Sequence, residues 1–224
     1  MSYRHWLACI AVCLAALLAI HLYDLGERQA LLRQFALDRG KGTDRIVERY
    51  GLPPEECIGE QHRKFYPLAA ALLTVEQLAT PRFESAARAG LAQAAAATGI
   101  GADFSIGPGR IKPSTARRLM QDHEGADVRT GDGVLTRRLL DPCGSLQVAI
   151  LLLEDISGRF PEETDLAFVR RAASLYNGQS APRTSLRADI AAQIYFDLVY
   201  NIFQHYRFAR RARGRRRAPA RNKE

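Results

Sequence analysis

The sequence has few residues of the kind that build metal centres and no pattern that builds sheets. It contains four cysteines in 224 residues, and neither Cys57 nor Cys143 has a second cysteine or a histidine at ligand spacing. The five histidines are scattered, so we expect no metal ion. Whether the two cysteines pair is left open, because pairing requires an oxidising compartment. No segment alternates for a strand's length between apolar and polar residues, and no repeat is visible, which predicts an all-α protein.

Most of the chain also lacks an excess of either charge. The formal net charge is +8, and residues 207–224 hold nine Lys or Arg and one Glu, which accounts for all of it. The neutral remainder argues against a nucleic-acid-binding face. This basic tail has almost no apolar residues after Phe208, so we expect it to be disordered or a fraying extension of a helix. Attachment to an anionic surface such as lipid headgroups would suit it, as would simple solvation.

One long apolar run stands at the N-terminus. Residues 6–23, WLACIAVCLAALLAIHLY, have no formal charge and are near the shortest length that spans a bilayer as a helix. Arg4 and His5 precede the run and Asp24 follows it, so the positive-inside rule places the N-terminus in the cytoplasm. A cleaved signal peptide is the alternative, but no clear small-x-small site ends the run. We predict a single-pass anchor over residues 1–24 in the inner (cytoplasmic) membrane and a domain on the periplasmic side.

Proline and glycine divide the rest of the chain into helices. Residues 25–59 predict a linker or collar, in which a short amphipathic helix breaks at Gly40 and Gly42 before a second helix at 44–50. The domain is predicted over residues 60–206, with a small hairpin near residues 104–111. Its expected helices are 65–79, 81–97, 113–123, 145–156, 165–175 and 188–206.

Two glutamates are candidates for acid–base chemistry. Leu68, Leu72 and Glu76 recur every four residues, so Glu76 extends the apolar stripe of its helix. A carboxyl group there either pairs with an arginine or keeps its proton at neutral pH, as a general acid must. Glu84 is the alternative. It lies in the first turn of the next helix with Arg88 four residues later, so the helix dipole and an ion pair already explain it.

Two further segments have features that suit ligand contact. Residues 105–116 read SIGPGRIKPSTA, in which two glycines flank a proline and allow the backbone to approach a ligand closely before a helix begins. Residues 172–178 read AASLYNG and end a helix with Tyr176 and Asn177, which offer a hydroxyl and an amide. The second segment is equally well explained as a helix C-cap.

Together, and in this order, three segments resemble those of lytic transglycosylases and related lysozyme-like enzymes of the goose and SLT type. Residues 107–116, GPGRIKPSTA, resemble the family's G-L-M-Q-I-x-P-x-T-A, and residues 172–178 resemble its A-x-x-x-Y-N-A/G. Residues 68–77, LAAALLTVEQ, look like the helix that ends in the catalytic glutamate. The matches cover roughly residues 66–178. The family usually has Ser after its glutamate, whereas Gln77 follows Glu76 here.

The resemblance implies a lysozyme-like helical domain that cleaves the glycan strands of peptidoglycan. Glu76 would be its single general acid and base, cutting between N-acetylmuramic acid and N-acetylglucosamine without a cofactor. Glu84 remains the alternative acid, because Ser85 follows it as in the family. A non-catalytic glycan-binding or envelope-scaffold protein is the rival function, favoured by an Arg where the family has Gln. The substrate-binding residues implied are Ser105, Gly107, Arg110, Tyr176 and Asn177.

Overall fold

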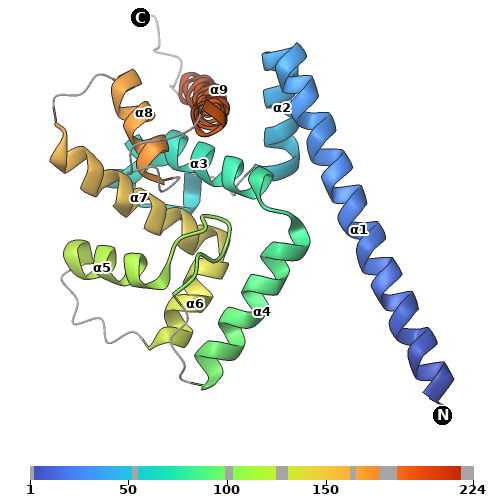
Figure 1. Cartoon of the computed structure of the whole chain (residues 1–224). Helices are drawn as coiled ribbons and strands as arrows, with labels where there is room; N and C mark the ends of the chain where they lie inside the picture. Colours follow the sequence, from blue (N-terminus) through green and yellow to red (C-terminus); the bar gives the residue numbers. More distant parts are fainter. Residues whose placement is uncertain are drawn as a thin grey trace, which may run out of the picture.

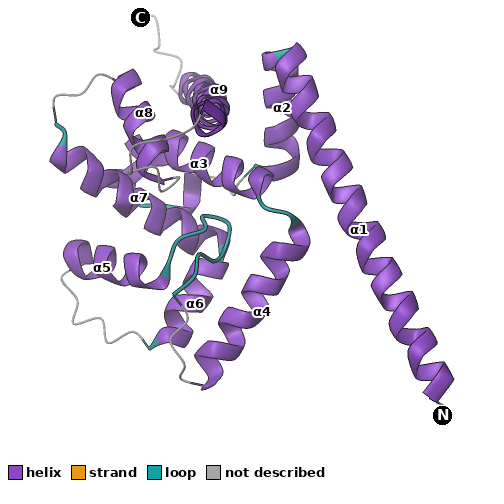
Figure 2. Ribbon diagram, in the orientation of Figure 1, coloured by secondary structure: helices purple, strands orange, loops and turns teal. Residues whose placement is uncertain are grey.

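The computed structural model describes residues 3–51, 55–98, 103–124, 131–161, 165–176 and 186–217. In these ranges the regular elements are helices, with one isolated antiparallel bridge between Ile106 and Ile111 where the hairpin was expected (Figure 2). The all-α class is therefore confirmed. The elements are α1 (Tyr3–Leu37), α2 (Arg39–Tyr50), the 3-10 helices η1 (Glu55–Cys57) and η2 (Glu60–Phe65), α3 (Tyr66–Ala79), α4 (Arg82–Thr98), α5 (Pro113–Glu124), α6 (Asp132–Leu140), α7 (Pro142–Arg159), α8 (Asp165–Tyr176) and α9 (Leu186–Arg217).

Helix α3 is the centre of the domain. Twelve of its 14 residues are buried, which reflects a sequence that is apolar on nearly all sides. It packs mainly against α9 and α7 and also contacts α2 and α8 (Figure 1). Pro67 lies in its first turn, where a missing N–H costs no hydrogen bond, and the helix ends shortly before Pro81. The fold thus places the C-terminal turn of α3, which contains Glu76, at the edge of the core.

Helix α1 joins the predicted anchor and the first predicted linker helix into one uninterrupted element. Toward its N-terminus it diverges from the remaining helices (Figure 1). The break expected at Gly40 and Gly42 lies earlier, because Asp38 accepts a hydrogen bond from the Lys41 N–H at 3.1 Å and caps α2. Both glycines belong to α2, and a Cβ on Gly42 would meet the Cα of Phe35 at 2.3 Å. That glycine lets α2 fold back closely on α1.

The side chains of the predicted anchor, residues 6–23, extend away from the protein. Apart from half-buried His21, every one of them that the structure describes is exposed. Residues 7–9 and 11 lie outside the described side chains. Among the residues that were described, no helix combines the length and the apolar character of a membrane span.

The chain departs from the sequence-based expectation at two other elements. Helix α6 was not predicted, and α9 runs beyond the expected domain boundary to Arg217. Of the two alternatives for the basic tail, a helical extension therefore holds up to that residue, and residues 218–224 lie outside the described part. The start of this extension is held by Arg210, which donates to the Arg63 carbonyl at 2.9 Å and pairs with Glu55 at 3.0 Å.

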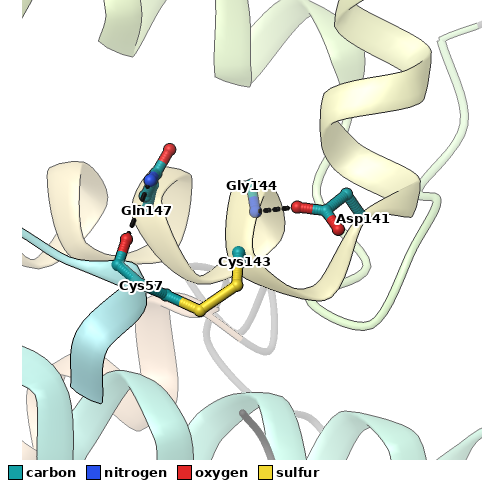
Figure 3. Close-up of a disulfide and its surroundings, with 5 residues drawn as sticks. All are labelled: Cys57, Asp141, Cys143, Gly144 and Gln147. Carbon is teal, nitrogen blue, oxygen red and sulfur yellow. Dashed lines mark hydrogen bonds between the residues drawn. A yellow bond between two sulfur atoms is a disulfide. The ribbon is translucent and has the colours of Figure 1, made fainter. Parts of the chain in front are cut away.

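A disulfide between Cys57 and Cys143 links η1 to the first turn of α7 (Figure 3). Next to it, the Asp141 carboxylate accepts a hydrogen bond from the Gly144 N–H at 2.7 Å and caps α7. Gln147 donates to the Cys57 carbonyl at 2.9 Å. The pairing that the sequence left open is thus present, and it joins the predicted linker to the helical domain.

Candidate active site

Glu76 lies in the last turn of α3 and is 9% exposed. It follows the buried Leu68 and Leu72 along the same stripe, which is the position that the sequence predicted. The hydroxyl of Tyr195, from α9, donates to Glu76 Oε1 at 2.7 Å. No ion pair involves Glu76 within the described parts of the chain, so a neutral phenol takes the place of an arginine partner.

This environment alters the proton equilibrium of the carboxyl group. Burial raises the pKa of Glu76 above its usual value, while the hydrogen bond from Tyr195 and the positive charge of Arg110 act in the opposite direction. Burial, the charge of Glu76 and the hydrogen bond to it raise the pKa of Tyr195 well above its usual value, so the phenol stays neutral and keeps its proton for Glu76. Glu76 therefore holds its proton to higher pH than an exposed glutamate does.

The loop before α5 is fixed against the ends of α6 and α7. Gly107 has φ of 70°, and a Cβ there would lie 1.7 Å from the Leu139 carbonyl oxygen. The Gly109 N–H donates to Ser145 Oγ at 2.9 Å, and the Tyr176 hydroxyl donates to the Gly109 carbonyl at 2.6 Å. The loop is therefore held at both backbone groups of Gly109, which explains why small residues stand in this segment.

Arg110 connects this loop to the end of α3. Its backbone is left-handed, with φ of 48°, a conformation that costs energy in a residue with a side chain. Its guanidinium donates to Thr80 Oγ1 at 2.7 Å, and Thr80 in turn donates to the Glu76 carbonyl at 2.8 Å. Arg110 is thus tied through Thr80 to the turn that carries Glu76.

Glu84 has different surroundings. Its carboxylate pairs with Arg88 at 2.9 Å, as the four-residue spacing predicted, and lies 3.6 Å from a guanidinium nitrogen of Arg110. The side chain is 40% exposed. These are the contacts of a surface ion pair at the start of a helix.

A cleft of about 500 Å³ lies beside Glu76 and is within the usual size range of small-molecule sites. Its walls come from α1, α2, the end of α3, α4 and the loop before α5, so the predicted collar forms part of it. Glu76, Gly107 and Arg110 all line the cleft. Two predicted parts of the site that are far apart in the sequence, Glu76 and the loop with Gly107 and Arg110, are therefore brought together.

The remaining predicted residues lie elsewhere. Ser105 and Tyr176 are not among the described residues that line the cleft. Tyr176 supports the loop through its bond to Gly109, and Ser105 is half-buried at the start of that loop. Asn177 lies outside the described residues. The predicted segment that ends at Tyr176 thus helps to shape the site, but the Tyr176 hydroxyl bonds Gly109 of the protein rather than facing the cleft.

Sequence reasoning missed the partner of Glu76 and the contribution of the collar. Tyr195 is 119 residues from Glu76 in the chain and stands in an apolar stretch, IYFDLVY, that is typical of a core-facing helix. Arg28 and Tyr50 also line the cleft, from helices predicted to act as a spacer. No local pattern distinguishes these residues, because their role depends on how α1, α2 and α9 pack.

Comparisons with known proteins give no match. Neither the family models, nor the curated proteins, nor the solved structures contain one that matches this chain. Within the described residues, no group of three His, Cys, Asp or Glu side chains is arranged to hold a metal ion. The resemblance to lytic transglycosylases therefore remains a hypothesis based on the three sequence segments and on the chemistry of Glu76.

Proposed function

We propose that this chain is a membrane-anchored lytic transglycosylase that cleaves peptidoglycan with Glu76 as general acid and base. The observation that carries this proposal is the buried Glu76 carboxyl group, whose pKa is raised and which lines a cleft. The order of the three segments that resemble the family supports it. Glu84, the alternative acid, is already engaged with Arg88 and Arg110.

The proposed reaction needs one carboxyl group. Glu76 donates its proton to the glycosidic oxygen between N-acetylmuramic acid and N-acetylglucosamine, and the bond from that oxygen to muramic C1 breaks. The carboxylate then takes the proton of the muramic 6-hydroxyl, whose oxygen bonds to C1 and closes a 1,6-anhydro ring. Tyr195 holds Oε1 and leaves Oε2 for the proton that moves. No water is consumed, and Glu76 ends protonated as it began.

The composition of the cleft favours this scheme over the two-carboxylate mechanism of most glycosidases. A second carboxyl group, about 5 to 10 Å from the acid, serves those enzymes as nucleophile or base. Among the described residues that line the cleft, Glu76 alone has a carboxyl group. Hydrolysis, in which water replaces the 6-hydroxyl, is the closest variant and releases a reducing end instead of an anhydro end.

Two observations support a single-pass location in the inner membrane with the domain on the periplasmic side. Apolar side chains of α1 such as Val12, Leu18 and Ile20 are about 60% exposed or more, so they have no protein core to enter. The disulfide is typical of proteins that fold in oxidising compartments. The basic end of α9 and the residues after it would contact an anionic surface.

The decisive experiment compares Glu76→Gln and Glu84→Gln with the wild-type chain on purified peptidoglycan sacs. Glutamine keeps the shape of the side chain and its acceptor for Tyr195 but has no proton to donate. We expect Glu76→Gln to reduce fragment release by at least about 100-fold, the usual contribution of a general acid, and Glu84→Gln to retain most of it. Mass spectrometry of the fragments separates anhydro from reducing ends.

The rival function is a non-catalytic glycan-binding or scaffold protein of the cell envelope. The specific observation in its favour is Arg110, which replaces the family's glutamine at the cleft and is tied to Thr80 and Glu84. Binding of the wild-type chain to peptidoglycan sacs without any release of soluble fragments would establish this function. Equal release by both glutamine variants would also contradict the role of Glu76.

A further inference from the structure

Two hydrogen-bond donors on the collar side of the cleft have no partner among the described residues. Arg28 is 5% exposed; its Nε donates to Asp24 at 3.0 Å and its Nη1 to the carbonyls of Gln77, at 3.1 Å, and Leu78, but its Nη2 is unpaired. The hydroxyl of Tyr50, which is 6% exposed, is unpaired as well. Oδ1 of Asp24, next to Arg28, also has no hydrogen-bond partner. Buried polar groups are normally satisfied, so hydrogen bonding on this side of the cleft is incomplete, with two donors left for one acceptor.

Both side chains belong to the cleft that contains Glu76. Arg28 and Tyr50 line it, and the guanidinium carbon of Arg28 lies 5.6 Å from the centre of the Tyr50 ring. Arg28 is also held on the carbonyl of Gln77, the residue directly after Glu76. Arg28, from α1, therefore contacts the same turn of α3 that carries the proposed acid, and Tyr50, from α2, lies beside it.

The charge of the cleft indicates what kind of acceptor it suits. Asp24 serves two arginines, since it bonds Arg28 and lies 3.7 Å from Arg82. Burial raises the pKa of Glu76, the single carboxyl group among the described residues of the lining. An anion is therefore better matched to this cleft than a neutral group. The lining includes four arginines: Arg28, Arg49, Arg82 and Arg110. Arg49 pairs with Glu27 at 2.8 Å and Arg110 lies 3.6 Å from Glu84. The excess of positive charge therefore comes from Arg28 and Arg82, which share the single carboxylate of Asp24.

We infer that Arg28 and Tyr50 bind a carboxylate of the muramic acid unit, either on its lactyl group or on the peptide attached to it. A carboxylate has two acceptor oxygens, which a guanidinium and a phenol can share in charge-assisted hydrogen bonds. This inference rests on the proposed function, because peptidoglycan is the glycan that carries a carboxylate next to the bond that Glu76 would cleave. The collar then acts as a specificity element of the site.

The test measures binding by calorimetry with full-length chain in detergent micelles, using Glu76→Gln to keep ligands intact. Three probes are compared: the N-acetylglucosamine–N-acetylmuramic acid disaccharide, the same disaccharide with its tetrapeptide, and uncharged chitobiose. We expect a carboxylate-bearing probe to bind at least about tenfold more tightly than chitobiose, as charge-assisted bonds provide. Binding of the peptide-free disaccharide assigns the lactyl carboxylate, and binding of the tetrapeptide form alone assigns the peptide.

The critical variant adds Tyr50→Phe, which removes only the unpaired hydroxyl. It should weaken the carboxylate-bearing probe about tenfold, leave chitobiose unchanged and not lower the temperature of unfolding, since no bond within the protein is lost. Tyr200→Phe, whose ring stacks on Phe196 away from the cleft, is the matched control and should change neither affinity.

Two results would overturn the inference: chitobiose binding as tightly as both muramic probes, or affinities that Tyr50→Phe leaves unchanged. The outcome is separate from that of the proposed function. Fragment release by Glu76→Gln would refute the catalytic role even if carboxylate binding depends on Tyr50. Conversely, unchanged binding in Tyr50→Phe leaves a Glu76-dependent cleavage intact.

Discussion

At Glu76, burial and a neutral hydrogen-bond donor act on the same carboxyl group. Burial disfavours the charged form, and Tyr195 favours it without supplying a charge of its own. An arginine in the place of Tyr195 would hold the group ionised and remove the proton that the proposed chemistry uses. Glu84, by contrast, is only partly buried and forms an ion pair with Arg88. The two glutamates are thus distinguished by their surroundings rather than by their distance along the chain.

This difference has a consequence for stability that does not depend on activity. A carboxyl group whose pKa is higher in the folded than in the unfolded chain binds more protons when folded, so its stabilising contribution is full below the unfolded value near 4.5. That contribution is lost as the pH rises through the folded pKa. The glutamine of Glu76→Gln does not ionise in this pH range, so this variant avoids the cost of a buried negative charge. We therefore expect it to unfold at a higher temperature than the wild-type chain at pH 7, with a smaller difference at pH 4, in thermal melts followed by circular dichroism.

Glu84→Gln is the control for this measurement. It removes a partly exposed ion pair and should give no gain in unfolding temperature at pH 7. A Glu76→Gln chain that is less stable than the wild type at neutral pH would mean that the carboxylate form is the one that the fold accommodates.

At the scale of the elements, the sequence predicts helix boundaries well where proline sets them. Pro67, Pro81 and Pro113 mark the start of α3, the gap before α4 and the start of α5, because a residue without an N–H fits a first turn. The nine-residue α6 was missed, since it is short and has no proline start. The break between α1 and α2 was misplaced because Asp38 caps the start of α2, and the two glycines lie inside that helix.

Only those features of the site that depend on the pattern within a single helix or loop could be predicted from the sequence. The apolar stripe of α3 is a local pattern and gave the burial of Glu76 correctly. The hydrogen bond from Tyr195 and the positions of Arg28 and Tyr50 depend on tertiary packing, which no spacing in one segment encodes. The hydroxyl of Tyr176 was expected to face a ligand, but the structure uses it to hold Gly109.

The disulfide makes a testable contribution at this scale. Cys57 and Cys143 are 86 residues apart, and closing a loop of that length stabilises a fold by about 4–5 kcal/mol in the chain-entropy model. Replacing both cysteines with serine should lower the free energy of unfolding by up to about that amount, measured by urea denaturation of the oxidised protein. The exposed Cys13→Ser is the matched control and should have no effect. Equal stability of the double variant and the wild type would contradict a structural role for the bond.

For the whole molecule, α1 is both the proposed membrane attachment and part of the cleft. Deleting residues 1–23 removes the apolar run but keeps Asp24, which bonds Arg28 and accepts from the Arg82 N–H at 3.0 Å. We expect the shortened chain to leave the membrane fraction after sedimentation and still to cleave purified sacs. The full-length chain, prepared in parallel, should sediment with the membranes. A shortened chain that still sediments with them would contradict anchoring by this run.

Because α1 is one unbroken helix, it also sets the distance between the apolar run and the cleft. Arg28 stands five residues beyond Tyr23, which is about 8 Å along a helix axis at 1.5 Å per residue. If the run before it spans the bilayer, the cleft is fixed at a short height above the lipid surface, without a flexible stalk that would let it reach outward. The proposed enzyme would then trim only the glycan layer nearest the membrane. Inserting whole helical turns after Tyr23 would move the zone of cutting outward in steps of about 5.4 Å.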